Sequence, residues 1–82
     1  MLSPVKKKRK KMRLTQIRMA NMAGVTQTYI SELENGDKDI DTRLVAFFRK
    51  YGHDTEVLQR QHQKFMQEIA RKERKRIVAA AK

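Results

Sequence analysis

Residues 14–36 read LTQIRMANMAGVTQTYISELENG, and this stretch predicts two short helices joined by a tight turn. Thr15 and Thr26 are of a residue type favoured at a helix N-cap, where the hydroxyl accepts a hydrogen bond from a backbone N–H of the first turn. Apolar residues follow each threonine at helical spacing. We therefore expect one helix over residues 16–23 and a second over residues 27–35.

The turn between these two helices places conditions on five positions. Gly24 must adopt a positive φ angle, and Ala20 must be small because the second helix packs across it. Apolar side chains must then fill the space between the helices, and the chain provides Val25, Ile30 and Leu33. Because all five conditions are met at fixed offsets, we predict a helix-turn-helix motif.

Further helices are predicted on both sides of the motif. Upstream, a serine followed by a proline predicts the start of a helix over residues 4–12. Downstream, Asp41 is a suitable cap for a helix over residues 42–51, in which Tyr51 is expected to join the core. A long helix is expected from about residue 54 to residue 80, since neither glycine nor proline follows. The sequence thus predicts an all-α chain of five helices.

Charge is distributed unevenly along the chain. The 82 residues include 20 Lys and Arg and 9 Asp and Glu, which gives a formal net charge of +11 at pH 7. Residues 1–18 hold eight basic groups and no acidic group, whereas residues 19–52 are close to neutral. Since lysines and arginines that neutralise phosphates release counterions, a polyanion is the expected partner. An anionic membrane surface is the alternative.

The composition argues against several other classes of protein. The chain has no cysteine, so it has neither a disulfide nor a thiolate metal site. His53 and His62 lack a nearby carboxylate cluster, so we expect no metal site and place both histidines in solvent or at a helix end. The sequence shows neither a glycine-rich phosphate loop nor a nucleophile paired with a base, so we expect no cofactor and no enzyme activity. No apolar run reaches the roughly 18 residues that span a bilayer, so a cytoplasmic protein is expected.

The stretch LTQIRMANMAGVTQTYISELENG resembles the Cro and phage-repressor type of helix-turn-helix regulators. Upstream, VKKKRKKMRLTQ is similar to the first helix of lambdoid repressors, and downstream, LVAFFRKYG is similar to their fourth helix and its closing glycine. The resemblance covers residues 3–59 and implies an all-α, five-helix, lambda-repressor-like DNA-binding domain. Residues 60–82 lie outside it and are expected to form a basic C-terminal helical extension.

The resemblance also implies roles for single residues. In lambdoid repressors, the arginine corresponding to Arg9 pairs with a glutamate near the end of the recognition helix, which here is Glu34. The lysine-rich segment is therefore expected to be a folded helix rather than a floppy arm. The family binds DNA as twofold dimers with a contact near the fifth helix, which nominates Val57, Leu58 and Phe65. The alternative is that these three side chains cover the core of their own chain.

The candidate base-reading surface lies on the second helix of the motif and is nearly uncharged. The amide of Gln27 can bond both N7 and N6 of adenine, and Thr28 can contact a thymine methyl group. Ser31 and Glu32 lie one helical turn further on. Glu32 can accept from cytosine N4, but it is equally well explained as a solvated residue or a partner of a basic side chain. A neutral surface is expected here because phosphate contacts position a protein, whereas base contacts specify the sequence.

Candidate phosphate contacts surround this surface: Gln16, Thr26, Asn35 and Lys38. A helix N-terminus favours an anion, and the family uses the position of Gln16 to clamp the DNA backbone, although helix capping is the alternative. Asn35 is also explained as a common helix ending. Lys38 lies in the acidic segment DKDID, which departs from the usually basic loop of the family. The three aspartates of that segment would repel DNA phosphates. The alternative is that the segment faces a protein partner or the basic tail of its own chain.

These observations predict a sequence-specific regulator of transcription that binds double-stranded DNA. We expect a repressor of phage or mobile-element type that acts as a homodimer on a palindromic operator. The alternative is a protein-interaction module, such as an antitoxin or a host-factor inhibitor, whose C-terminal helix engages a protein partner. A third hypothesis is a sequence-indifferent binder of nucleic acid or membrane, against which the uncharged Gln27, Thr28 and Ser31 argue.

Overall fold

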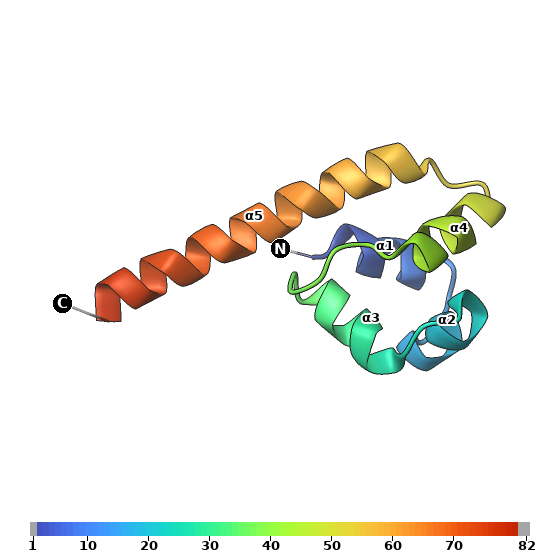
Figure 1. Cartoon of the computed structure of the whole chain (residues 1–82), viewed down its shortest axis with the longest axis horizontal. Coiled ribbons are helices and arrows are strands. Elements are labelled where there is room, and N and C mark those ends of the chain that lie inside the picture. The colour runs from blue at the N-terminus through green and yellow to red at the C-terminus, as the bar shows by residue number, and fades with distance from the viewer. Residues whose placement is uncertain (1, 81–82) are drawn as a thin grey trace.

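The computed structural model describes the backbone of residues 2–80 and the side chains of residues 2–73. Within this range the chain forms five helices and no strand: α1 (Pro4–Lys11), α2 (Gln16–Ala23), α3 (Gln27–Glu34), α4 (Thr42–Lys50) and α5 (Thr55–Ala80). The first four helices pack together, and α5 lies across them and extends beyond them (Figure 1). The predicted all-α, five-helix fold is confirmed.

Each of the first four helices begins at a side-chain cap. In every case the capping oxygen accepts a hydrogen bond from a backbone N–H of the first turn, and such a cap stabilises a helix by about 1 kcal/mol. The four caps are Ser3, Thr15, Thr26 and Asp41. The sequence predicts all four, because a cap depends only on residues that are neighbours in the chain.

The end of α1 is unusual because its left-handed residue is not a glycine. Arg13 has a φ angle of 58°. The backbone N–H groups of Arg13 and Leu14 donate to the carbonyl oxygens of Lys10 and Arg9, at 3.0 and 3.1 Å, which is the arrangement that often closes a helix. The Arg9 side chain also donates to the Leu14 carbonyl oxygen at 2.8 Å. This additional contact holds a turn that costs the chain backbone strain.

One apolar core joins all five helices. Its buried members are Val5, Met19, Ala20, Ile30, Leu33, Ile40, Leu44, Phe47, Phe48 and Leu58. The expectation that Tyr51 belongs to this core is wrong, because its side chain is 48% exposed. Its ring packs on Phe47 with centroids 5.1 Å apart, but it lies at the C-cap, where α4 ends.

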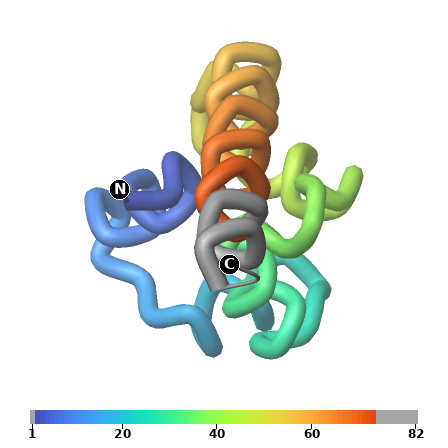
Figure 2. The backbone as a smooth tube through the Cα atoms, turned by 90° about the vertical axis from the view of Figure 1, so that its left-hand side faces the viewer, coloured from blue at the N-terminus to red at the C-terminus, as the bar shows by residue number. Residues whose placement is uncertain are grey.

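Helix α5 covers the core with one stripe of side chains. The stripe includes Leu58, His62 and Phe65, all of which are buried. Viewed from the end of α5, α1 lies to one side of this helix and the chain from the end of α3 through α4 lies to the other (Figure 2). The expectation that Leu58 and Phe65 contact a second copy is therefore wrong: both cover their own chain, and only Val57 of the three nominated residues is exposed.

The expectation that both histidines are in solvent or at a helix end is wrong for His62. Its side chain is fully buried within α5, and Nε2 lies 2.7 Å from the carbonyl oxygen of Lys38. Because a carbonyl only accepts, Nε2 carries the proton and donates this bond. His62 thus anchors the segment that follows α3.

Gly36 provides a test of how tightly α5 packs on the end of α3. It has a φ angle of 85°, and a Cβ at this position would lie 3.1 Å from Ile69 Cγ1 and 3.3 Å from Phe65 Cε2. Gly24 also has a positive φ angle, of 73°, but a Cβ there would meet nothing within 4 Å. We expect Gly24→Ala to lower the free energy of unfolding by about 1 kcal/mol, and Gly36→Ala by about 2 kcal/mol or more because crowding adds to the backbone strain. Urea denaturation measures both losses, and equal values would contradict close packing of α5 at Gly36.

Candidate nucleic-acid interface

The turn between α2 and α3 has the geometry of the predicted motif. Gly24 is left-handed, and the Val25 N–H donates to the Ala20 carbonyl oxygen at 3.0 Å. Ala20 is buried, as the packing of α3 across α2 requires. Arg43 of α4 donates from Nη1 to the Gly24 carbonyl oxygen at 2.9 Å. Sequence reasoning missed this last contact, because no local pattern links α4 to the turn.

The predicted base-reading residues come together at the surface. Gln27 and Thr28 are exposed, and Ser31 and Glu32 are partly exposed. These four side chains and Gln16 line one shallow hollow between the beginnings of α2 and α3. The hollow therefore presents amide and hydroxyl groups, together with a single carboxylate, to an approaching ligand.

The predicted phosphate contacts divide between the two ends of α3. At the first end, the Thr26 side chain accepts from the Tyr29 N–H at 3.0 Å, which leaves its hydroxyl hydrogen free to donate. At the other end, Asn35 and Lys38 are exposed. The side chains of Lys38 and Glu32 approach to 3.8 Å. Since both side chains are well exposed, this ion pair is weak, and both residues stay available for other contacts.

The expected pair of Arg9 and Glu34 is present and buried. Arg9 Nε donates to Glu34 Oε2 at 2.7 Å, and Arg9 Nη2 donates to Oε1 at 3.0 Å. The side chains are only 11% and 3% exposed. Gln16 Nε2 also donates to Glu34 Oε1, at 3.1 Å. Gln16 is thus held in place by Glu34 while one amide N–H and the amide oxygen stay available at the hollow.

A family model described as helix-turn-helix matches residues 5–46, which is just over half of the chain. The chain belongs to the Cro and phage-repressor type helix-turn-helix family. It is accordingly a DNA-binding helix-turn-helix regulator. The match begins in α1 and ends in α4, so it includes the whole motif and the hollow. A search of curated proteins and a search of solved structures each found no match.

The segment that follows α3 is attached to α3 by hydrogen bonds. The hydroxyl of Tyr29 donates to the Asp39 carbonyl oxygen and accepts from the Asp41 N–H, both at 2.6 Å. Burial raises the pKa of Tyr29 above its ordinary value, so the hydroxyl keeps the proton that it donates. Helix α3 and the loop that follows it are thus joined through the side chain of Tyr29.

The acidic segment DKDID has roles within the fold, of which the sequence predicts only the Asp41 cap of α4. Asp39 Oδ2 accepts from Gln63 of α5 at 2.9 Å. Asp41 caps α4 and accepts from the Arg43 side chain, and these hydrogen bonds lower the pKa of Asp41 below its ordinary value. Two of the three aspartates therefore stabilise the fold of their own chain.

Two kinds of feature are absent from the residues that the structure describes. No helix of the described residues is both long and apolar enough to cross a bilayer. Nor do these residues bring together three or more histidine, aspartate or glutamate side chains around a common point that could hold a metal ion.

Breaking the pair of Arg9 and Glu34 from one side tests its importance. We expect Arg9→Met to lower the free energy of unfolding by about 3 to 5 kcal/mol, because it leaves the buried carboxylate of Glu34 without its cation. The double variant Arg9→Met/Glu34→Leu should recover most of that loss, since it removes both charges. Arg43→Met, which breaks an exposed pair, should cost much less. Urea denaturation compares the variants, and a double variant as unstable as the single one would contradict this account.

Proposed function

We propose that the protein is a repressor of phage or mobile-element type that binds a palindromic operator as a homodimer. In this proposal α3 enters the major groove of double-stranded DNA, and Gln27, Thr28 and Ser31 contact base edges. Glu32 contacts cytosine N4 where the operator offers it, and otherwise pairs with Lys38. The protein represses by occupying DNA that overlaps a promoter.

The observation that carries the proposal is the hollow at the beginning of α3. A surface that bound any polyanion would concentrate lysine and arginine, yet this one presents mainly amide and hydroxyl groups. Those groups match the donors and acceptors of base edges in the major groove. Gln16 and Thr26 stand at the beginnings of α2 and α3, where backbone N–H groups favour a phosphate. Asn35 and Lys38 provide phosphate contacts at the other end of α3.

The corner between α4 and α5 supports the homodimer. Tyr51 and Val57 are exposed on the two sides of this corner, at 48% and 38% of their surface. The corner lies outside the hollow, so a second copy can bind there while α3 is engaged with DNA. A twofold dimer would place two recognition helices in major grooves about 34 Å apart.

Selection from random duplex DNA tests the proposed function. We expect the enriched sequences to share one palindrome, with half-sites separated by about one helical turn. Binding that is uniform over all sequences and falls steeply with salt would show a sequence-indifferent protein instead. Enrichment of a single half-site would contradict the dimer but not the reading of bases.

Gln27→Ala tests base reading on the selected operator. If the amide hydrogen-bonds adenine, the variant should lose about 1 to 3 kcal/mol of binding free energy for the operator. It should also tolerate other bases at the position of that adenine, and at that position alone. Asn35→Ala is the matched control, because a lost phosphate contact weakens binding on every sequence alike. Titration of operator variants by fluorescence anisotropy separates the two patterns. A uniform loss for Gln27→Ala would refute its assignment.

Val57→Asp tests the dimer. Because a twofold dimer contains each residue of the contact twice, the substitution would bury two carboxylates at an apolar interface. We therefore expect the dimer to be weaker by about tenfold or more. Met22→Asp is the control, since Met22 is also exposed but lies on α2. Sedimentation equilibrium measures the association of each variant without DNA. Unchanged association of Val57→Asp would place the contact elsewhere.

A further inference from the structure

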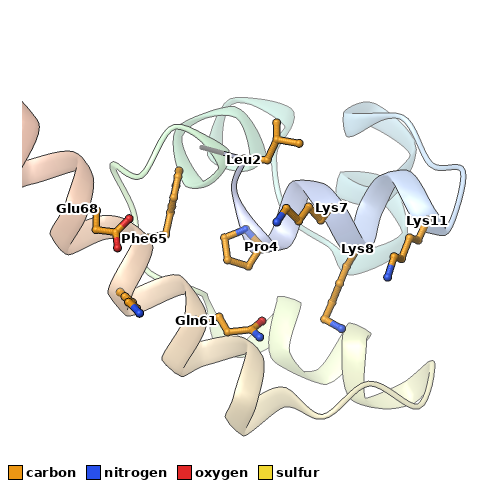
Figure 3. Close-up of a pocket in the computed structure, with 9 residues that line it drawn as sticks. Leu2, Pro4, Lys7, Lys8, Lys11, Gln61, Phe65 and Glu68 are labelled. Atoms are coloured by element: carbon orange, nitrogen blue, oxygen red, sulfur yellow. The ribbon is translucent and has the colours of Figure 1, made fainter.

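A groove between α1 and α5 is not used by the proposed DNA contacts. It has a volume of about 500 Å³. Figure 3 shows Lys7, Lys8 and Lys11 on the α1 side of this groove, facing Gln61, Phe65 and Glu68 on α5. The groove shares no lining residue with the hollow at the beginning of α3.

The groove carries an excess of positive charge. Four lysines line it, three from α1 and Lys64 from α5, whereas Glu68 is its single acidic residue. Among residues 2–73, no carboxylate forms an ion pair with a lysine of α1. Like charges held side by side repel each other, and a negative ligand relieves that repulsion. An anionic occupant is therefore favoured.

The groove also has apolar walls. Leu2, Pro4 and Phe65 contribute to its lining, and Leu2 is 50% exposed. The long lysine side chains add apolar stems below their ammonium groups. An occupant that fits must bring an apolar side chain as well as negative charge. We propose that this groove binds an acidic peptide segment of a partner protein, with an apolar side chain placed between α1 and α5.

The carboxylate of Glu68 favours a peptide over a nucleic acid. Its Oε2 atom is covered and has no hydrogen-bond partner within the described chain. A peptide brings backbone N–H groups, which can donate to this carboxylate once the Glu68 side chain turns toward the groove, together with carboxylates for the lysines. The phosphates of a DNA strand have no proton to donate to this carboxylate.

The position of the groove allows both ligands to bind at once. Helix α5 lies on the opposite side of the domain from the beginning of α3 in both views (Figures 1 and 2). A partner in the groove therefore need not displace DNA from the hollow. This inference is independent of the proposed repressor function, because peptide binding can be measured without DNA.

Selection from a displayed library of random peptides tests the groove. The full chain is the bait, beside two variants that change the net charge equally on the same helix. Lys7→Gln/Lys11→Gln alters the groove, whereas Lys6→Gln/Lys10→Gln alters lysines that do not line it. We expect wild type and the second variant to enrich peptides that combine Asp or Glu with an apolar residue, and the first variant to enrich none of them.

The affinity of an enriched peptide then gives the size of each effect. Lys7→Gln/Lys11→Gln should weaken binding by about fivefold or more, since two ion pairs are lost. Replacing the apolar residue of the peptide with serine should weaken it by about tenfold. Circular dichroism confirms that both variants are folded.

Three outcomes would overturn the proposal. One is enrichment of peptides without acidic residues, or of none at all. Another is equal loss of peptide binding for the two lysine variants. The third is a result with random duplex or single-stranded DNA, in which Lys7→Gln/Lys11→Gln weakens DNA binding more than Lys6→Gln/Lys10→Gln does, whereas peptide binding is the same for the two variants. That result would make the groove a nucleic-acid site. Operator selection is unaffected by any of these results, so failure here is distinct from failure of the repressor proposal.

Discussion

The pair of Arg9 and Glu34 is the contact on which the placement of the first three helices depends. Its two hydrogen bonds join α1 to the end of α3, a third bond from Arg9 holds the turn before α2, and a bond from Gln16 joins α2 to the same glutamate. Two apolar residues would fill the same space but would not define an orientation. A buried pair adds little net stability against such a substitute, so its contribution here is directional. The angle at which α3 is presented follows from these four bonds.

The other side of the recognition helix is supported by the fifth helix. Tyr29 on α3 and His62 on α5 both bind the loop that follows α3, through hydrogen bonds to its backbone. Gly36 lets α5 approach the end of α3 so closely that a Cβ at this position would crowd Ile69 and Phe65. The end of α3 is therefore held by hydrogen bonds and close packing, and a helix that is already ordered loses less conformational entropy when it binds a ligand.

The sequence predicts those features that depend on neighbours in the chain. Capping residues and apolar spacing identify five helices, and the resemblance to phage repressors identifies the partner of Arg9. Other features escape because tertiary contacts decide them, and three examples show how. His62 occupies an inward position between Leu58 and Phe65, and the gap in the apolar stripe at that position was the only signal. Arg13 is left-handed without being glycine. The sequence pattern of an apolar stripe on α5 is also the same in two cases: the stripe can cover the core of its own chain, as Leu58 and Phe65 do, or it can contact a second copy.

The distribution of charge shows why net charge alone is a poor guide to DNA contacts. The chain carries +11, and much of this charge lies in α1. Lys7 and Lys11 line the groove with α5, away from the hollow that faces DNA in the proposed complex. Counterion release depends on the phosphates that are neutralised, not on the total number of cations. The salt dependence of operator binding would then report the cations near α2 and α3, and the charge on α1 would be left for a different acidic ligand.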